Sequence, residues 1–347
     1  MKNNDTIIQK QLLTCAYVVK NETIYYYTQY DTKLVKWDIA ENTIDVIYTM
    51  PKGVYMDEKI LLVNNTIFSL DVGGHYLYIF DLDEKNYKEV SIDCHTNNWG
   101  NFAGIFNEGE SIVIIPTERE YFLRYDIKNE ILSKHSTKAI SSETIPYVFS
   151  LSNKCYVFSL KGNGYYSIEN GKSLSIYYGK HECKMDFAAY YNDDKNLYSI
   201  DTKGDIFIWN NEEKRFDIIL HTGIVDCGTF VVLNNYVVSL PVYPGGSIYK
   251  YDICNKQLIK YEEYPKDFDY IGEKTMSAYC RPVVTSGFLI FPTRSTNYAL
   301  CVDKRKEELA WKKPIANEIV FFRAKMKREG IINEGIEYTI NDLVEAL

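Results

Sequence analysis

The chain has 347 residues and a formal net charge of −8, with 39 Lys and Arg against 47 Asp and Glu. This acidic balance excludes nucleic acid and anionic membrane surfaces as main partners, because phosphate binding needs a clustered positive face. No apolar run approaches the roughly 18 residues of a membrane span, so we expect no membrane insertion. The single basic cluster, residues 323–328, is interpreted as a solvated stretch.

The start of the chain and its cysteines bear on its location. The first six residues, Met-Lys-Asn-Asn-Asp-Thr, lack the apolar stretch of a secretory signal. None of the eight cysteines forms a CxxC pair, so we interpret them as reduced core residues. The sequence therefore predicts a cytoplasmic protein, and we expect a monomer without a cofactor.

A pattern of short apolar strands and turns returns seven times along the chain. Each copy has an aromatic or aliphatic pair followed by an acidic or amide residue. These recurrent residues are Asp38, Asp81, Asp126, Glu169, Asn210, Asp252 and Asp303, at steps of 43, 45, 43, 41, 42 and 51. A period of roughly 40–50 residues built from short strands is typical of propeller blades, which must stack on neighbours to bury their faces.

Each copy divides into four strands, a to d from the inside outward. In the third copy we expect them at residues 101–106, 111–115, 121–127 and 130–134. Turn residues such as the asparagines at 234–235 favour tight a–b hairpins with positive φ. The recurrent acid follows strand c, where an Asp side chain can hydrogen-bond the backbone of its own turn. Three copies end strand b with proline and continue into loops that differ from one another, at Pro116, Pro241 and Pro292.

The two ends of the chain fall outside the repeat. Residues 6–10 either add a strand to the last blade and close the ring, or simply precede it. We predict that residues 1–315 form the propeller and residues 316–347 a C-terminal extension. Its last segment, 339–347, has apolar residues at i, i+3, i+4 and i+7 spacing. This spacing predicts a short helix, which must dock on the propeller or on a partner because it is too short to be stable alone.

Several segments resemble the blades of known propeller families. Gly73-Gly74 before a Tyr-bearing strand looks like a kelch blade, and Trp37-Asp38 and Trp209-Asn210 are similar to the end of WD repeats. Residues 299–311, which end in Trp311, look like a quinoprotein-type repeat. The chain thus resembles the seven-bladed β-propeller superfamily over about nine-tenths of its length. We therefore predict an all-β, seven-bladed β-propeller with four antiparallel strands per blade and a short C-terminal helical appendage. No family's functional residues carry over.

The leading hypothesis for function is a non-enzymatic scaffold that binds a protein or peptide through its loop-rich rim. Constant strands with variable loops are typical of such a scaffold, and the sequence contains no phosphate loop or nucleophile elbow. Large aromatic residues and arginine forks on the rim are the candidate contacts. They are Trp99, Tyr178, Tyr243, Tyr264 and Tyr270, with Arg119 and Arg294. The alternative for several of these aromatic residues is packing within their own loops.

A second hypothesis is a carbohydrate-active propeller, either a sugar-binding module or a lyase or hydrolase that acts on a glycan. Aromatic rims suit sugar rings, and polar groups near the central channel would bind the sugar or act on it. The candidate polar groups are Arg281, His95, His181 and His221. The histidines have no HxH or HxxxH spacing, so no metal site is predicted. They are either general bases at the channel mouth or ordinary loop residues.

Overall fold

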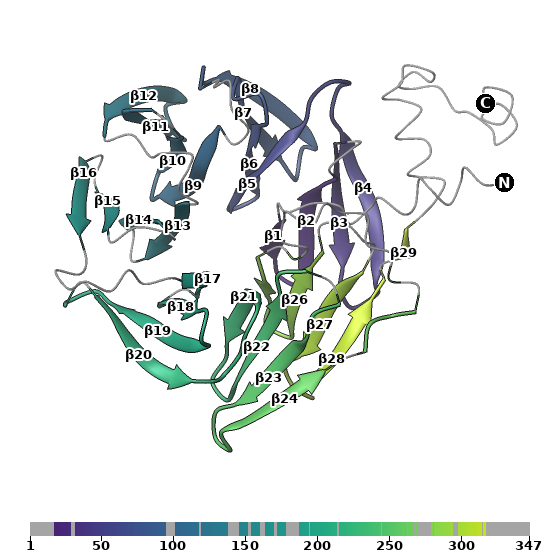
Figure 1. The fold of residues 1–347 in the computed structure, drawn as a ribbon. Helices are drawn as coiled ribbons and strands as arrows, with labels where there is room; N and C mark the ends of the chain where they lie inside the picture. The colour runs from purple at the N-terminus through teal and green to yellow at the C-terminus, as the bar shows by residue number, and fades with distance from the viewer. Residues whose placement is uncertain are drawn as a thin grey trace, which may run out of the picture.

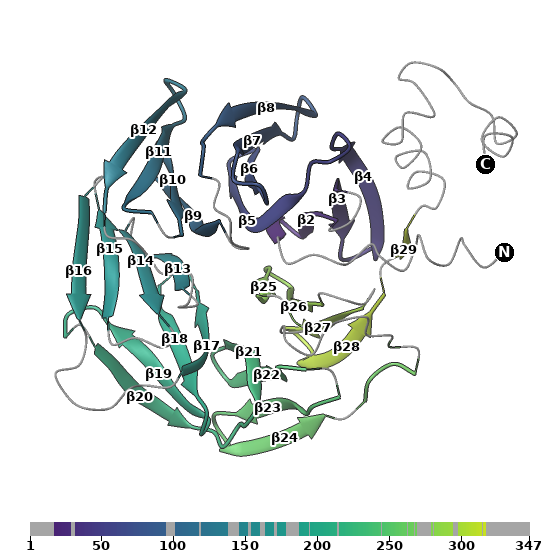
Figure 2. The same cartoon turned by 45° about the horizontal axis from the view of Figure 1, so that its top comes forward.

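The computed structural model describes residues 17–316 apart from 29–31, 95–100, 118, 138–145, 152–153, 160–163, 170–171, 178–186, 194, 214, 244, 262, 267, 269–278, 280, 294–297 and 314. Within these residues the chain folds into seven β-sheets around a common centre (Figures 1 and 2). Each sheet contains four consecutive strands that pair antiparallel in chain order. The predicted all-β fold of seven four-stranded blades is therefore confirmed. The helix predicted at 339–347 lies outside the described residues.

The strands of each blade, a to d, run in chain order from the centre outward. Blades 1 and 2 contain β1 (Tyr17–Lys20), β2 (Thr23–Tyr27), β3 (Lys33–Asp38), β4 (Thr43–Thr49), β5 (Met56–Val63), β6 (Thr66–Asp71), β7 (Tyr76–Asp81) and β8 (Asn86–Ser91). Blades 3 and 4 contain β9 (Phe102–Glu108), β10 (Ser111–Pro116), β11 (Tyr121–Asp126), β12 (Ile131–Ser136), β13 (Pro146–Leu151), β14 (Lys154–Ser159), β15 (Gly164–Glu169) and β16 (Lys172–Tyr177). Blades 5 and 6 contain β17 (Phe187–Asn192), β18 (Leu197–Asp201), β19 (Asp205–Asn210), β20 (Arg215–His221), β21 (Cys227–Val232), β22 (Tyr236–Pro241), β23 (Ile248–Asp252) and β24 (Gln257–Tyr261). Blade 7 contains β25 (Val283–Val284), β26 (Phe288–Pro292), β27 (Ala299–Asp303) and β28 (Glu308–Lys312), and β29 (Ile315–Ala316) follows it.

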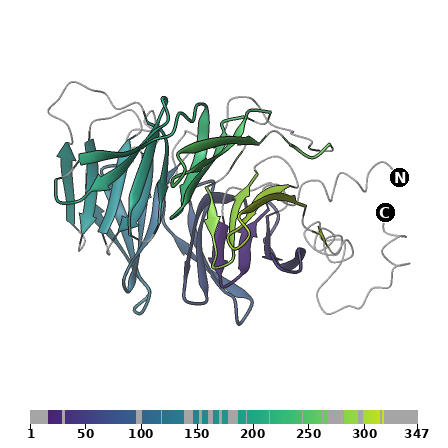
Figure 3. The ribbon, with the colours of Figure 1, turned by 90° about the horizontal axis from the view of Figure 1, so that it is seen from below.

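The apolar core lies between neighbouring blades. The b strands β10 and β22 are buried at every position, whereas the outermost strands β8 and β12 have no buried residue. One core cluster joins blades 2 and 3 around Phe68, Leu77 and Tyr125, and another joins blades 5, 6 and 7. Figure 3 shows neighbouring sheets standing side by side. Each blade therefore buries its faces only by stacking on the next one.

The recurrent acidic or amide residue ends strand c of every blade. In six blades its side-chain oxygen accepts a backbone N–H of the turn that follows. For example, Asp126 Oδ1 accepts from Asn129 N at 2.8 Å, and Asp252 Oδ1 from Asn255 N at 2.8 Å. These bonds favour the charged form and hold the pKa of Asp126 and Asp252 below the usual range. The predicted turn-capping role is thus confirmed in the blades where these side chains are described.

The ring closes between blades 7 and 1, a boundary that we call the seam. Beyond blade 7, β29 pairs in parallel with β4, with Ile315 opposite Thr43 and Ala316 opposite Ile44. Strand pairing with blade 1 therefore extends across the predicted boundary at residue 315. Residues 6–10, the other candidate for closure, lie outside the described residues.

Side chains on the a–b hairpins strengthen the seam. The Glu22 carboxylate of blade 1 accepts hydrogen bonds from Thr285 Oγ1 at 2.8 Å, from Gly287 N at 3.3 Å and from the Ser286 hydroxyl. A shared apolar cluster, which includes Trp37 of blade 1 and Ile290 of blade 7, lies between the two sheets. The two ends of the described chain are thus joined by backbone, polar and apolar contacts at once.

Candidate functional site

Antiparallel pairing places the connections between strands on two faces of the ring. The b–c and d–a connections lie on one face, which we call the upper face, and the a–b and c–d connections lie on the lower face. Propeller loops of this kind vary while the strands stay constant, so binding residues are expected on them. The predicted residues that the structure describes are Arg119, His221, Tyr243, Tyr264 and Arg281, and all belong to the upper face by their place in the strand order.

The b–c loop of blade 2 is held in shape by a buried carboxylate. Asp71 Oδ1 accepts hydrogen bonds from the backbone N–H groups of His75 at 2.9 Å and Tyr76 at 2.6 Å. Gly74 has a φ of 74°, and a Cβ added to Gly73 would lie 2.7 Å from Asp71 Oδ2. Only glycines fit this loop without strain. The glycine pair that resembles a kelch blade is therefore explained by the conformation of this loop.

This loop and the connection between β4 and β5 present an apolar surface that the sequence did not indicate. Tyr55 is 49% exposed, Val72 38% and Tyr76 39%, and we call these three residues the blade-2 patch. Val72 N donates to Tyr55 O at 2.8 Å, and Asn101 Nδ2 of the next blade donates to Val72 O at 2.5 Å. The patch is therefore braced by the backbone and by a neighbouring blade. Sequence analysis missed all three residues, and the only available signal was the glycine pair beside them.

Half of the exposed large apolar residues of the described chain lie on the upper face. Ten such residues are recorded, and half of them lie on upper-face connections or strand ends: Tyr55, Val72, Tyr76, Val225 and Tyr243. Four others lie on the outermost strands of three different blades: Ile131, Ile218, Ile219 and Leu258. The tenth is Val284 at the end of β25. The upper face thus carries more of the exposed large apolar side chains than any other part of the described chain.

The predicted aromatic anchors Tyr243 and Tyr264 have different surroundings. Tyr243 is 40% exposed in the b–c connection of blade 6. The Tyr264 hydroxyl instead donates to Gly246 O at 3.0 Å and lies 3.0 Å from the Tyr279 hydroxyl. Its ring packs 5.4 Å from that of Trp311, and burial raises the pKa of its hydroxyl. Tyr264 is therefore half-buried against a blade-6 loop, against Tyr279 and against strand β28 of blade 7.

The three described polar candidates lie apart in the strand order. His221 ends β20, the outermost strand of blade 5, and its Nδ1 lies 2.8 Å from Asp205 Oδ1. The imidazole is 75% exposed, so it lies at the circumference. Arg119 is half-buried between β10 and β11, and Arg281 is exposed two residues before β25. Of these, Arg281 is placed beside an innermost strand.

The remaining predicted residues fall outside the part of the chain that the structure describes. They are Trp99, Tyr178, Tyr270, Arg294, His95 and His181. Their proposed roles stay predictions.

An acidic residue on an innermost strand was also missed by sequence analysis. Asp57 of β5 is buried, and burial raises the pKa of its carboxyl. Its Oδ1 accepts from Lys59 N at 3.0 Å and lies 3.4 Å from Lys59 Nζ, which opposes that shift. The polar run Asp57-Glu58-Lys59 gives no apolar pattern that would mark it in the sequence as part of an innermost strand. A buried carboxyl of this kind is able to accept or donate a proton.

Two further features are absent from the described residues. They contain no group of three or more His, Cys, Asp or Glu side chains placed to hold a metal ion. They also contain no helix with the length and apolarity of a membrane span.

Comparison with known proteins rests on structure, because no family model and no curated protein matches the sequence. A streptogramin B lyase matches with a TM-score of 0.60 and 9% identity, over 83% of this chain and 92% of that chain. A computationally designed protein, Ika8, matches with a TM-score of 0.55 and 12% identity, over 89% of this chain and 90% of that one. This chain is a seven-bladed β-propeller. A chain of the Mitotic Checkpoint Complex also matches this propeller, with a TM-score of 0.52 and 8% identity over 88% of each chain. Identities this low show the fold of the propeller and leave its activity to its own residues.

Proposed function

We propose that this propeller is a non-enzymatic scaffold of the cytoplasm that binds a protein or peptide through its upper face. The observation that carries the proposal is that half of the recorded exposed large apolar residues lie on upper-face connections, three of them in the blade-2 patch. Large aromatic side chains supply most of the binding energy at protein interfaces. Tyr55, Tyr76 and Tyr243 are such side chains, and Val72 in blade 2 and Val225 between blades 5 and 6 are exposed apolar residues on the same face.

Preorganisation supports the same assignment. Asp71 fixes the loop that carries the blade-2 patch, and Asn101 ties it to blade 3. A loop that is already ordered loses little conformational entropy when a partner binds. The conformational entropy of the loop that carries Val72 and Tyr76 is therefore already lost in the free protein, and binding does not lose it again. The similar chain within the Mitotic Checkpoint Complex supports a role in a protein assembly, because this fold occurs there in a multi-protein complex.

Affinity capture from cell lysate tests the proposal with matched variants. The variant Tyr55→Ala/Tyr76→Ala should lose the proteins that the wild-type chain retains, because removal of a central aromatic contact weakens binding by more than about tenfold. The control Ile218→Ala/Ile219→Ala removes two exposed apolar residues from the outermost strand of blade 5 and should retain them. Equal retention by both variants, with unchanged melting temperatures, would count against the upper face.

A second candidate is action on a glycan or another small substrate at the central channel. It is favoured by the buried Asp57 carboxyl on an innermost strand and by the structural similarity to a streptogramin B lyase, an enzyme by its name. The test is a glycan array together with a panel of lyase and hydrolase substrates. Turnover that Asp57→Asn abolishes would establish this candidate. An absence of hits would leave the scaffold as the function.

A further inference from the structure

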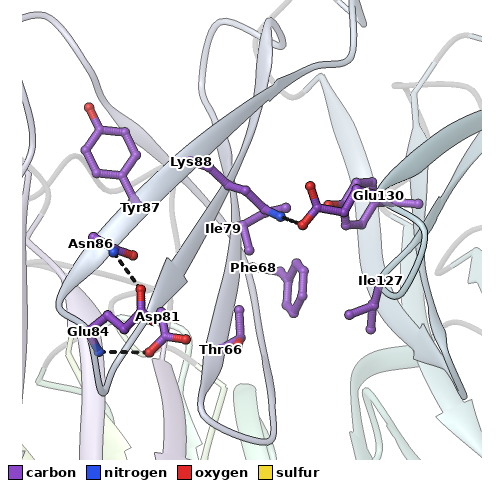
Figure 4. Close-up of a pocket in the computed structure, with 11 residues that line it drawn as sticks. Thr66, Phe68, Ile79, Asp81, Glu84, Asn86, Tyr87, Lys88, Ile127 and Glu130 are labelled. Carbon is purple, nitrogen blue, oxygen red and sulfur yellow. Dashed lines mark hydrogen bonds and ion pairs between the residues drawn. The ribbon is translucent and has the colours of Figure 1, made fainter.

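A pocket of about 500 Å³ lies on the lower face between blades 2 and 3, on the side opposite to the proposed binding face. This volume falls within the roughly 300–1,000 Å³ of small-molecule sites. Phe68 and Ile79 of blade 2 and Ile127 of blade 3 form its apolar wall (Figure 4). Asp81 and Glu84 lie on one side of its mouth.

The far side of the pocket is polar as well. Lys88 of β8 reaches across to the Glu130 carboxylate of blade 3 (Figure 4). Burial opposes the charge of Lys88, but Glu130 and the Tyr125 hydroxyl outweigh it and raise the pKa of the ammonium. Three carboxylates and one ammonium line the pocket, so it has an excess of negative charge. Tyr125 is buried in the wall, and its hydroxyl makes no hydrogen bond of ordinary geometry within the described residues.

The equivalent groove between blades 6 and 7 explains why this pocket exists. Strand registers place Lys250 of β23 where blade 2 has Ile79, since each stands two residues before the recurrent acid and opposite the corresponding position of strand b. The same registers place Tyr236 of β22 where blade 2 has Thr66. The smaller Thr66 leaves space that a tyrosine ring takes up in the other groove.

Lys250 occupies its groove in a defined way. Its ammonium lies 4.5 Å from the centre of the Tyr236 ring and 3.0 Å from Glu307 Oε2. Glu307 stands four residues after its recurrent Asp, as Glu130 does in blade 3, and both have positive φ, 55° and 58°. Lys250 also helps to lower the pKa of Asp252, after the hydrogen bonds from Asn255. The propeller therefore contains one groove filled by its own lysine side chain.

The lysine of blade 2 stands on the neighbouring strand instead. Ile79 of β7 pairs with Lys88 of β8, whereas Lys250 of β23 pairs with Ile259 of β24. The exchange of the two residue types moves the ammonium to the outer strand. The groove between blades 2 and 3 therefore has an apolar wall next to acidic groups. At the same position the groove between blades 6 and 7 contains the alkyl chain and ammonium of Lys250.

We propose that the pocket between blades 2 and 3 binds the side chain of a lysine from a peptide partner, with the alkyl chain against Phe68, Ile79 and Ile127 and the ammonium beside Asp81 and Glu84. An alkyl chain that ends in a cation matches both halves of the pocket, because such side chains bury their methylene groups and keep the charge at a polar rim. In the filled groove Lys250 likewise packs its side chain into the groove, with its ammonium on Glu307, whose counterpart Glu130 pairs with Lys88 here. This site lies on the lower face and does not depend on the proposed function of the upper face.

The test follows the methyl groups of Ile79 and Ile127 by nuclear magnetic resonance in the full-length protein. The probe is the peptide acetyl-Gly-Lys-Gly-amide, with n-butylammonium as the free-amine arm and the Nε-acetyl-lysine peptide as the neutral arm. The lysine peptide should shift both methyl signals in a saturable way. The neutral peptide should bind at least about threefold more weakly, as expected for the loss of partly exposed charge pairs.

Variants locate the charge that matters. Asp81→Asn/Glu84→Gln should weaken the lysine peptide at least about threefold. The turn should survive, because Asn210 caps the equivalent turn of blade 5 through Oδ1 at 3.1 Å. Asp252→Asn, the matched change in the filled groove, should leave the affinity unchanged. Ile79→Lys should fill the pocket from within and abolish the shift of Ile127. If that variant does not fold, the Asp81→Asn/Glu84→Gln pair decides.

Three results would overturn the proposal. The first is no saturable shift of the two methyl signals, and the second is equal binding of the neutral peptide, which would make the pocket merely apolar. The third is binding of n-butylammonium with exclusion of the lysine peptide, which would assign the site to a free amine.

Discussion

The seam between blades 7 and 1 and the groove between blades 2 and 3 are the same kind of boundary with different solutions. At the seam, Glu22 alone holds three residues of a hairpin more than 260 positions away, and β29 adds a parallel strand to β4. At the groove, one exposed ion pair between Lys88 and Glu130 spans an open pocket. The chain itself links blades 2 and 3, whereas only non-covalent contacts close the ring. Apolar clusters join the blades at both boundaries. The seam has the added strand pairing and the Glu22 hydrogen bonds where no covalent connection helps, and the groove is left available for binding.

The largest expected effect is at the apolar core of the seam. Trp37 is completely buried in the cluster that blades 1 and 7 share. Trp37→Ala should lower the free energy of unfolding by about 3–5 kcal/mol, because it removes a large side chain and leaves a cavity. Urea denaturation followed by circular dichroism measures this loss. A loss below about 1 kcal/mol would show that the seam contributes little to ring closure.

A smaller effect, with a defined pH dependence, is expected for the polar part of the seam. The hydrogen bond from Ser286, with those from Thr285 and Gly287, outweighs burial and lowers the pKa of Glu22 from its ordinary value of 4.5. A lowered folded-state pKa stabilises the fold above the unfolded-state pKa, and that stability is lost as the pH falls through the folded value. Glu22→Gln should therefore cost about 1 kcal/mol at pH 7, a value reduced by solvent exposure.

The matching measurement compares the wild-type chain and Glu22→Gln from pH 7 to pH 3. Their free energies of unfolding should begin to converge below pH 4.5 and continue to do so as the pH falls through the lower folded-state pKa of Glu22. A gap that stays constant across this range would mean that the charge of Glu22 has no part in closing the seam.

The smallest effect is expected at the groove. Lys88 and Glu130 are largely exposed, and exposed ion pairs contribute little to stability. Lys88→Ala should change the free energy of unfolding by less than about 0.5 kcal/mol, in contrast to Trp37→Ala and Glu22→Gln. Thermal denaturation at low salt is the sensitive measurement. A destabilisation as large as that of Glu22→Gln would remove the distinction between seam and groove.

The repeat could be predicted from the sequence because its signals are local. The recurrent acids fall at the ends of strands c, and Pro116, Pro241 and Pro292 end their b strands as expected. Hairpin geometry was less predictable. The residues at 234–235 do not have the expected positive φ, which occurs at Asn21 and Asn64 instead. The identity of a turn residue restricts its backbone without fixing the turn type.

The candidate sites were predictable only in part, because they depend on residues distant in sequence. Tyr264 was predicted to be a rim anchor, but its ring packs against Trp311 and its hydroxyl contacts that of Tyr279. The blade-2 patch depends on which side chains the Asp71 loop leaves uncovered, which composition does not reveal. The pocket between blades 2 and 3 depends on side chains from two blades, and its difference from the filled groove follows from Ile79 at the position of Lys250.

The most direct test of the scaffold function is site-specific photo-crosslinking in cells. A photoreactive phenylalanine analogue is placed at Tyr76 or Tyr243 on the upper face, and at Ile218 on the outermost strand of blade 5 as the control. Binding through the upper face predicts the same discrete protein adducts from Tyr76 and Tyr243, and none of them from Ile218. Adducts of equal yield at all three positions, or none at Tyr76 and Tyr243, would contradict it.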